Sequence, residues 1–398
     1  MKNTWRFNGN ELKYLKEVID SGFGSGTSGN MNQRFEQAFS EVVDAKYAIT
    51  FNSGTSTLHA ALHAVGVSSG DEVIIPPLTV ISNLSVVLAQ NATPVFADVC
   101  EKTFNIDPDD IERKITSKTK AIMPVSLYGL SCDIEKIKKL GEKYNIPIIL
   151  DAAESYLATC NGKNASKIAD ICSYSTENSK HIATGDGGIV VTDNEEYAIK
   201  MRKFGSLGYA ALTSGDGRIR LNKSVFQDPN YKRHDEFALN YRMPEVAAAL
   251  GLAQTERIEH FVNLRCEIAK MYQDVVDQCD FLLSQKIPDN YRHTYWTYVV
   301  RLMRDDISWY DFRDKYAEFG GDGIYAAWAL LYDETLYSSG VFKDRCPAYY
   351  QDIKLNQRFC PIAEKIQPRL FQFVTNYENC QEAKKTMESL QKTIDYFK

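Results

Sequence analysis

Between about residues 46 and 192, short apolar runs alternate with longer segments in which apolar residues recur every three or four positions. Runs of about four to eight apolar residues are typical of buried strands, and the longer periodic segments are typical of amphipathic helices. A regular alternation of strand and helix builds a largely parallel sheet with helices on both faces. We predict seven strands, at residues 47–51, 72–75, 94–97, 121–125, 146–150, 171–174 and 188–192.

The pattern changes in the second half of the chain. Residues 244–278 form one long helical pattern that we expect to lead out of the large sheet. Residues 295–302 alternate like a half-buried strand, and residues 380–397 have the pattern of an amphipathic helix. These elements predict a second, smaller α+β domain. We place the large domain, with its N-terminal segment, at residues 1–255 and the small C-terminal domain at residues 256–398.

The composition is that of an ordinary globular protein. A chain of 398 residues has room for two domains, and 44% hydrophobic and 25% charged residues are common values. The net charge is −6, and no block of lysines and arginines is interleaved with aromatic residues. We therefore expect no nucleic-acid partner.

Two further patterns indicate a cytoplasmic protein. Residues 1–10 lack the apolar core of a signal peptide, and no apolar run is long enough to span a bilayer. The nine cysteines are scattered and include no C-x-x-C pair. They are typical of reduced thiols in a cytosolic protein, and we expect neither a membrane contact nor a metal site.

Candidate chemistry collects where the predicted strands end. A Ser53-Gly54-Thr55-Ser56 turn follows the first strand and opens a helix, and Asp151 follows the apolar run 146–150. Ser175 ends another strand, five residues before Lys180, and a Gly185-Asp186-Gly187-Gly188 turn comes after the lysine. Ligands of parallel sheets bind at the carboxyl ends of the strands, so these motifs are expected to converge. A helix N-terminus suits a phosphate, and a desolvated lysine can serve as a reactive amine.

The order, spacing and residue types of these motifs resemble those of the DegT/StrS-type sugar aminotransferases, which have pyridoxal 5'-phosphate (PLP) fold type I. The resemblance runs from about residue 23 to residue 242 and continues more weakly at Gly323-Ile324 and Cys360-Pro361. It implies an aspartate aminotransferase-like fold, with a seven-stranded, mostly parallel sheet between helices and a smaller α+β domain. It also implies PLP bound as a Schiff base to Lys180, and Asp151 paired with the pyridine nitrogen.

The resemblance extends to the phosphate and to the oligomer. Gly54, Thr55 and Ser175 correspond to phosphate-binding positions. Asn240, in Asn240-Tyr241-Arg242-Met243, corresponds to a residue that reaches the phosphate of the neighbouring subunit. The resemblance therefore implies a homodimer with shared active sites.

Two cofactor positions and two surface segments depart from the family pattern. Val80 stands where the family usually has an aromatic residue against the cofactor ring, and Glu154 stands where Gln or His is common near the phenolic oxygen. The polar stretch 214–234, which we expect to be a long surface loop, and residues 368–377 also differ from the common form. We interpret these two segments as substrate-specific surfaces.

The family's chemistry implies the reaction. An amino acid, for which we expect L-glutamate, would give its amino group to PLP and leave pyridoxamine 5'-phosphate (PMP). PMP would then aminate a keto group of a nucleotide-activated keto-deoxysugar, in a pocket lined by Tyr325 and Trp328.

Three other functions stay open. The acceptor could be a keto-cyclitol or a keto-sugar acid. A PLP- or PMP-dependent sugar 3-dehydratase, in which histidine replaces the lysine, is disfavoured by Lys180, although His181 is adjacent. A catalytically silent cofactor-binding regulator is disfavoured by the complete set of motifs.

Two sequence signals point to other ligands and are set aside. Residues 24–29 fit the G-x-G-x-x-G pattern of dinucleotide sites, with Asp44 at a suitable distance, but a helical pattern precedes them where a strand is required. His59 and His63 lie one helical turn apart, as zinc ligands can, but no third ligand is placed near them. We predict that both histidines have structural roles in their helix.

Overall fold

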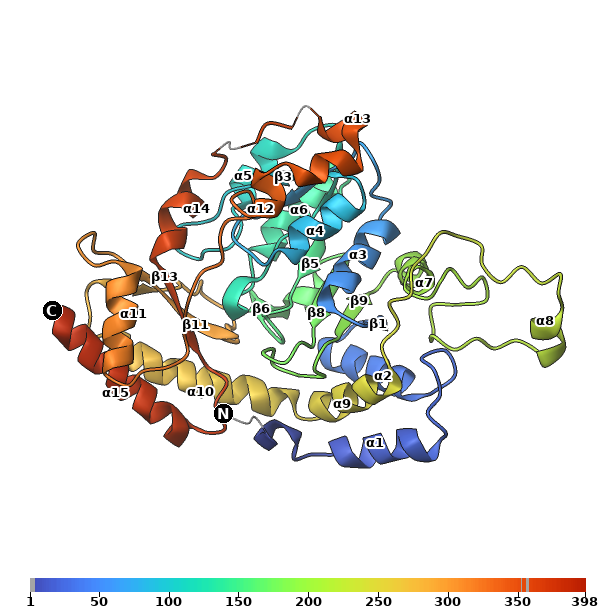
Figure 1. The fold of residues 1–398 in the computed structure, drawn as a ribbon, viewed down its shortest axis with the longest axis horizontal. Coiled ribbons are helices and arrows are strands. Elements are labelled where there is room, and N and C mark those ends of the chain that lie inside the picture. The colour runs from blue at the N-terminus through green and yellow to red at the C-terminus, as the bar shows by residue number, and fades with distance from the viewer. Residues whose placement is uncertain (1–3, 352, 356–357) are drawn as a thin grey trace.

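The computed structural model describes residues 4–351, 353–355 and 358–398. Figure 1 shows a large helix-covered sheet with a smaller sheet and three helices beside it. In the described part of the chain the large sheet has seven strands, in the order β3-β2-β4-β5-β8-β9-β1. These strands are β1 (Tyr47–Phe51), β2 (Glu72–Ile75), β3 (Thr93–Phe96), β4 (Thr119–Ile122), β5 (Ile149–Asp151), β8 (Ile171–Ser175) and β9 (Gly188–Thr192).

The strands lie where the apolar runs predict them, and the sheet is mostly parallel. Neighbouring strands from β3 to β8 run parallel, and parallel bridges at Ile122–Ile148 and Val125–Asp151 join β4 to β5. β9 runs antiparallel to both β8 and β1. The loop between β8 and β9 therefore turns back at the edge of the sheet where β5 also ends.

Alternate residues of the strands face two separate helix layers. Val190 belongs to a core with Leu58 of α3, whereas Val191 belongs to a core with Phe39 of α2. This division explains why the buried strands read as continuous apolar runs. The first layer contains α3 (Gly54–Ala64), α4 (Ser82–Ala89) and α7 (Glu195–Phe204). The second contains α1 (Glu11–Asp20), α2 (Met31–Val43), α5 (Pro108–Lys114), α6 (Ile134–Tyr144) and α9 (Glu245–Thr255).

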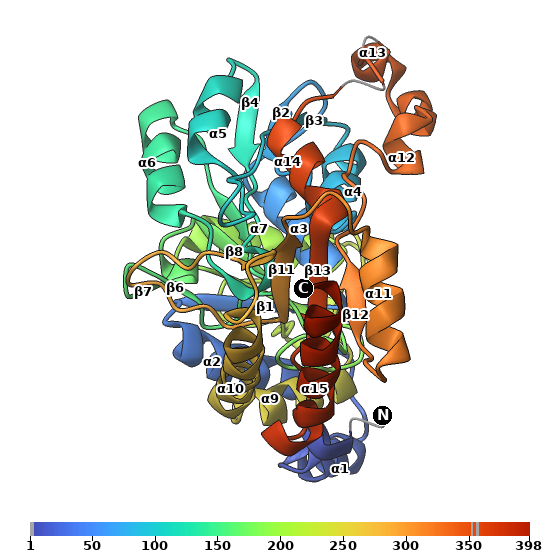
Figure 2. The same ribbon diagram turned by 90° about the vertical axis from the view of Figure 1, so that its left-hand side faces the viewer.

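The smaller sheet is antiparallel and has the order β10-β11-β13-β12. Helices α10, α11 and α15 flank it, as Figure 2 shows, and share a third apolar core with it. The strands are β10 (Leu282–Ser284), β11 (Thr297–Leu302), β12 (Ile324–Ala326) and β13 (Leu370–Val374), and the helices are α10 (Ile258–Val276), α11 (Trp309–Glu318) and α15 (Cys380–Phe397).

The predicted continuous helical stretch 244–278 is two helices. α9 ends at Thr255 and α10 begins at Ile258, and Arg257 between them has φ −121°. The Arg257 guanidinium donates to the carbonyl oxygen of Arg6 at 2.6 Å and to the carboxylate of Glu11. Contacts with the N-terminal segment therefore accompany the break.

A segment late in the chain returns to the large sheet. Leu331 N–H donates to the Pro77 carbonyl, and the Tyr350 hydroxyl donates to the Ala92 carbonyl, both at 2.9 Å. Several buried side chains of this segment, among them Tyr337, Phe342 and Tyr350, belong to the same core as α3 and α4. The domain boundary after residue 255 stays a prediction, since this segment packs outside the small sheet. Its helices are α12 (Thr335–Ser338), η4 (Val341–Arg345), α13 (Pro347–Tyr350) and α14 (Pro361–Ile366).

A long arm projects from the large sheet at the right of Figure 1. It covers residues 206–240 and includes the short helix α8 (Lys223–Gln227), so the predicted surface loop contains one helical turn. Among the described residues, the structure contains no helix with the length and apolarity that crossing a membrane requires. The remaining short elements are η1 (Thr4–Phe7), η2 (Leu127–Gly129), β6 (Thr159–Cys160), β7 (Lys163–Asn164), η3 (Ala165–Lys167) and η5 (Gln367–Arg369).

Candidate active site

The first turn of α3 forms a cradle suited to a phosphate. Ser53 caps the helix by accepting from Ser56 N–H at 3.1 Å, and the Ser56 hydroxyl bonds back to Ser53 N–H at 3.1 Å. This capping box fixes the turn at Gly54 and Thr55, where helix amides and the helix dipole favour an anion. Thr55 is exposed, and its hydroxyl lies 2.8 Å from that of Ser82 at the start of α4.

Glycine is required in this cradle because the first turn of α3, the end of β8 and the start of β9 lie very close together. A Cβ on Gly54 would lie 2.8 Å from Cβ of Ser175 at the end of β8. A Cβ on Gly188, the first residue of β9, would lie 2.5 Å from the Ser53 carbonyl oxygen. The three residues predicted to bind phosphate, Gly54, Thr55 and Ser175, therefore come together in the structure.

Asp151 lies at the end of β5 and is fully buried. Its Oδ2 accepts from Nδ2 of Asn83 at 2.9 Å, and its Oδ1 accepts from Ala153 N–H at 3.0 Å. Burial raises the pKa of Asp151, and the bonds from Asn83 and Ala153 and the charge of Lys180 oppose that rise. A buried carboxylate of this kind gains from a cationic partner, which a protonated pyridine nitrogen would be.

Sequence reasoning missed Asn83. It lies on α4, 68 positions before Asp151, and its Oδ1 is buried without a hydrogen-bond partner among the described residues. A buried amide oxygen without a hydrogen-bond partner is unusual in a protein core, where most buried polar groups are paired. No local pattern distinguishes this asparagine, because its role depends on a contact between α4 and β5.

Glu154 and Lys180 form a buried pair beside Asp151. Oε1 of Glu154 lies 3.6 Å from Nζ of Lys180, and Oε2 accepts from Tyr128 N–H at 2.8 Å. Tyr128 has φ 63°, a strained value for a bulky residue, so that its N–H points at the carboxylate. Burial raises the pKa of Glu154 to about 7, and Lys180 opposes that rise.

Lys180 is carried by the loop between β8 and β9, and its side chain is only 12% exposed. Nζ lies 3.9 Å from the ring centre of Trp296, whose Nε1 donates to the Ser179 carbonyl at 3.1 Å. The amine is therefore confined between Glu154 and an indole, in a place with limited access to water. Trp296 was not predicted, because it comes from the entry to β11 in the small domain.

The two predicted substrate residues, Tyr325 and Trp328, line one cavity, and Lys180 is not among the residues that line it. The cavity has a volume of about 780 Å³, and the Lys180 loop contributes Asn178 and Ser179 to its wall. Trp328 stacks on Trp296 with ring centres 5.7 Å apart, whereas Tyr325 is exposed. The cavity is large enough for a drug-sized ligand and has an aromatic wall.

Val80 and Asn240 lie at the margins of the site. Val80 is half-buried just before α4, where its carbonyl accepts from Asn83 N–H at 3.3 Å. Asn240 is exposed, and its neighbour Tyr241 is fixed by a 2.8 Å bond from Asn52 N–H to the Tyr241 carbonyl. Within this chain the Asn240 side chain is free to meet another molecule.

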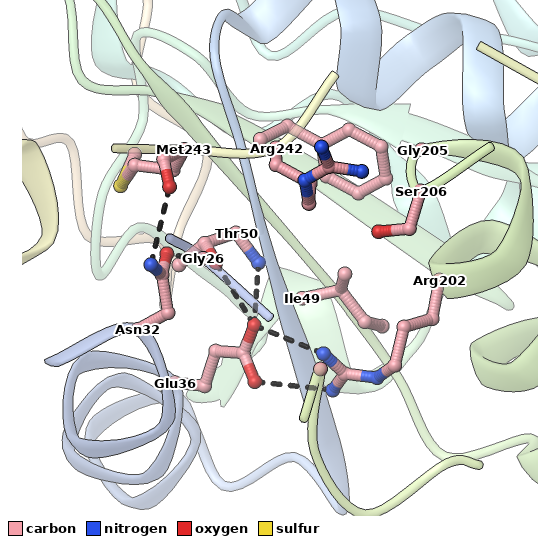
Figure 3. A pocket seen from close by; sticks show the side chains of 12 residues that line it. Gly26, Asn32, Glu36, Ile49, Thr50, Arg202, Gly205, Ser206, Arg242 and Met243 are labelled. Carbon is pink, nitrogen blue, oxygen red and sulfur yellow. Dashed lines mark hydrogen bonds and ion pairs between the residues drawn. The ribbon is translucent and has the colours of Figure 1, made fainter. Parts of the chain in front are cut away.

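A second, much smaller cavity is lined in part by Arg242 and Met243 (Figure 3). Its volume is about 20 Å³, room for about one water molecule. Nη1 and Nη2 of Arg202 on α7 each donate to the Glu36 carboxylate on α2 at 3.1 Å, and Glu36 also accepts from Thr50 N–H on β1. This buried pair joins two helices to the sheet and is a structural feature.

The structure shows what surrounds the residues of the two rival signals. Helix α1 precedes the glycines at residues 24–29, so the strand that a dinucleotide fingerprint needs is not there. His59 bonds through Nδ1 to the Tyr241 hydroxyl at 3.0 Å, and His63 stacks on Phe204. Among the described residues, no three His, Cys, Asp or Glu side chains are placed to hold a metal ion.

The geometry fits a cofactor with a phosphate, a basic ring nitrogen and an aldehyde. The cradle at Gly54 has no room for a Cβ and presents helix amides to an anion. Asp151 is a buried anion, and Lys180 is a confined amine. These are the three groups that PLP requires of a protein.

Known proteins are similar to this chain in sequence and in structure. Residues 6–377 match the model of the DegT/DnrJ/EryC1/StrS aminotransferase family. A GDP-perosamine synthase from Caulobacter vibrioides is 37% identical over 299 residues, which are 75% of this chain and 76% of that protein.

Solved structures resemble the chain along nearly its full length. An aminotransferase from Psychrobacter cryohalolentis superposes with a TM-score of 0.84 at 27% identity, covering 97% of this chain and 96% of the other. NtdA from Bacillus subtilis, solved with bound cofactor PMP, has a TM-score of 0.77 at 26% identity, covering 97% and 81%.

Proposed function

Because the chain belongs to the DegT/DnrJ/EryC1/StrS aminotransferase family, we propose that it transfers an amino group from L-glutamate to the keto group of a nucleotide-linked keto-deoxysugar. The predicted fold class and cofactor are confirmed: the protein is a PLP-dependent aminotransferase of fold type I. The name of the Caulobacter relative, GDP-perosamine synthase, supports a sugar linked to guanosine diphosphate as the acceptor.

One observation carries the proposal for the site. Lys180, Asp151 and the cradle at Gly54 and Ser175 come from separate strand ends and converge at one edge of the sheet. When bound, PLP supplies an electron sink for the carbanion that forms at the substrate carbon. Asp151 would keep the pyridine nitrogen protonated, and the cradle would hold the phosphate.

Lys180 has a second task in this proposal. After the amino donor has displaced it from the cofactor, its neutral amine would carry a proton between the substrate carbon and the cofactor carbon. The Glu154 carboxylate, 3.6 Å from Nζ, is placed to take a proton from Lys180 and to return it. The indole of Trp296 would limit the access of water to this exchange.

The cavity that contains Tyr325 and Trp328 has room for a large acceptor, and Trp296, whose ring contacts Nζ of Lys180, is part of its wall. Its volume of about 780 Å³ and its aromatic residues Trp296, Trp328 and Tyr325 suit a sugar with an attached nucleotide. A keto-cyclitol or keto-sugar acid would use the same lysine chemistry and would fill less of this space.

The sugar 3-dehydratase alternative gains no support from His181. The ring of His181 is buried on the other side of the loop, with Nε2 2.8 Å from the Thr294 carbonyl. Burial lowers the pKa of His181 well below its usual value, so the ring is neutral and packed. Lys180 is the residue that reaches Glu154.

The proposal includes a homodimer in the cytoplasm. Asn240 is exposed within this chain, as a residue that completes a partner's phosphate site would be. A two-fold interface makes such sharing reciprocal, so both sites would be completed together.

Borohydride reduction followed by peptide mapping tests the role of Lys180. We expect the cofactor to be fixed on the peptide that contains Lys180. A tag on another lysine, or no visible cofactor band, would refute this role. Incubation with a panel of nucleotide keto-sugars and glutamate, read by mass spectrometry, tests the acceptor and distinguishes it from a cyclitol or a sugar acid.

A further inference from the structure

The N-terminal segment of the chain contacts the loop that carries Lys180. Arg6, in η1, is fully buried. Its Nη1 donates to the Asn178 carbonyl at 2.6 Å, and its Nη2 donates to the carbonyls of Lys180 at 2.6 Å and His181 at 3.0 Å. One guanidinium from residue 6 thus binds three carbonyls of a loop more than 170 positions away.

A second buried arginine binds the same loop from the other direction. Arg265, on α10, donates through Nη2 to the carbonyls of Ser179 at 2.9 Å and Lys180 at 3.2 Å. Its Nη1 donates to the Trp296 carbonyl at 2.7 Å. We call Arg6 and Arg265 together the arginine clamp. It binds the four consecutive carbonyls of residues 178–181.

The clamp is costly to bury. Desolvation lowers the pKa of Arg6 to about 10 and lowers that of Arg265 well below its usual value. The hydrogen bonds that the structure gives these guanidiniums end on backbone carbonyls, apart from one on the Thr375 hydroxyl at 3.2 Å. A buried arginine ordinarily pairs with a carboxylate, so two of them on one stretch of backbone need a reason.

The loop has little regular structure of its own. Residues 176–187 contain neither helix nor strand, and within the lysine turn Lys180 N–H donates to the Glu177 carbonyl at 3.0 Å. Asn178 is exposed, Ser179 and Lys180 are half-buried and His181 is buried, and the clamp donates to the carbonyls of all four residues, with Trp296 Nε1 as a further donor to Ser179. Without the arginine clamp these carbonyls would lose the donors that it supplies, and we expect the Lys180 backbone to move.

We propose that Arg6 and Arg265 are positioning residues that fix the backbone of Lys180 so that its amine meets the cofactor aldehyde. This inference rests on the proposed role of Lys180. In the step concerned, the neutral Nζ would bond to the aldehyde carbon of PLP, and the aldehyde oxygen would leave as water with the two protons of the amine. A displacement of about 1 Å can slow such a step by about 10²-fold, because the reacting atoms must lie close and aligned.

The test uses Arg6→Lys and Arg265→Lys, since one ammonium cannot bind several carbonyls as a planar guanidinium does. Arg202→Lys is the matched control, because Arg202 is as buried as Arg265 but binds Glu36, away from the loop (Figure 3). Arg6→Gln, which keeps one amide donor, replaces any clamp variant that does not fold. Each full-length protein is stripped of cofactor, and its melting temperature is recorded.

Two measurements separate positioning from folding. The rate of PLP attachment is followed by visible absorbance and checked by borohydride mapping to Lys180. The affinity for PMP, which lacks an aldehyde and cannot attach to lysine, reports cofactor binding by the cradle and Asp151 without the attachment step. We expect the clamp variants to attach PLP about 10- to 100-fold more slowly, with PMP affinity unchanged. Arg202→Lys should attach PLP at the wild-type rate, even if it melts as early as the clamp variants.

Wild-type attachment rates in Arg6→Lys and Arg6→Gln would overturn the proposal. So would an equal slowing in Arg202→Lys at an equal loss of melting temperature. If PLP attaches to another lysine in the wild-type protein, the role of Lys180 fails instead. No sugar or amino donor is present, so an error about the acceptor leaves the result unaffected.

Discussion

Asp151 is a buried carboxylate whose direct hydrogen-bond donors are neutral. Asn83 and Ala153 N–H bind its two oxygens, and Lys180 acts on it only through its charge. The pocket thus holds an anion at some cost and leaves it available for a cation. That arrangement suits a residue that must protonate a ring nitrogen and is poor as a purely structural link.

Asp151→Asn should separate these two roles. The variant removes a buried charge, and Asn83 can turn its unpaired Oδ1 towards the new amide. We therefore expect the cofactor-free protein to melt no earlier than wild type. The rate of the glutamate half-reaction should fall on the order of 10²-fold, because the ring nitrogen loses its anionic partner. A half-reaction at wild-type speed, followed by stopped-flow absorbance, would reduce Asp151 to a packing residue.

Glu154 predicts a pH dependence of stability in the cofactor-free protein. Its carboxyl has an ordinary pKa of 4.5, and burial, with the charge of Asp151, raises that pKa to about 7 in the folded state although Lys180 opposes the rise. Between these values the folded state holds the extra proton, so the free energy of unfolding falls as pH rises through this window. Each unit of difference corresponds to about 1.4 kcal/mol.

Glu154→Gln should reduce the loss of unfolding free energy between pH 5 and pH 7.5, because the amide does not titrate. Urea unfolding of the cofactor-free protein at these two pH values measures that loss. Glu388→Gln, at an exposed position on α15, is the control and should keep the wild-type difference. Equal pH differences in wild type and Glu154→Gln would show that this carboxyl does not titrate in the window.

The sequence could predict those residues whose position along the chain reveals their role. Asp151 follows an apolar run, and Gly54 opens a helix after a strand, so strand-end chemistry identifies both. Asn83, Trp296 and Arg6 could not be identified in this way. Each acts through a contact with a distant segment, and its neighbours in sequence carry no sign of it.

At the scale of elements, the cradle depends on the close approach of α3, β8 and β9. Gly188 of β9 leaves no room for a methyl group, since a Cβ would lie 2.5 Å from the Ser53 carbonyl oxygen and 2.8 Å from Gly54 N. The position of the α3 N-terminus, and with it the direction of its free amides, is therefore determined by a residue outside the helix.

Gly188→Ala should weaken phosphate binding by pushing the α3 N-terminus aside. Overpacking costs about 1–3 kcal/mol, which corresponds to roughly 5- to 150-fold in affinity if it acts on this site. Fluorescence titration should show the loss for PMP and little change for pyridoxamine, which lacks the phosphate. Gly215→Ala is the control, since its nearest neighbour lies 3.9 Å from the added Cβ. Equal losses for both ligands would argue against the cradle.

Elements were predictable where the local pattern was strong. The seven strands of the large sheet were predicted from their apolar runs. The break between α9 and α10 was not predictable, because Glu256 and Arg257 are good helix formers. The break coincides with the bond from Arg257 to the N-terminal segment, a tertiary contact.

At the scale of the molecule, one chain leaves apolar surface around the arm uncovered. Phe237 is 80% exposed, and Phe226 on α8 is 42% exposed. Asn240 is exposed at the base of the same arm. Apolar surface on a projecting segment commonly marks a contact with another protein, and a second copy would also bring Asn240 to a neighbouring cradle.

Subunit mixing tests whether Asn240 acts across such an interface. Lys180→Ala and Asn240→Ala, each of low activity alone, are co-expressed with different tags, and the mixed dimers are purified. If Asn240 serves the partner's site, each mixed dimer has one site with both defects and one with neither, so about half of the wild-type activity returns. If Asn240 serves its own site, every site keeps one defect and activity stays low. Light scattering at the assay concentration must show a dimer, and a monomer there would contradict shared sites outright.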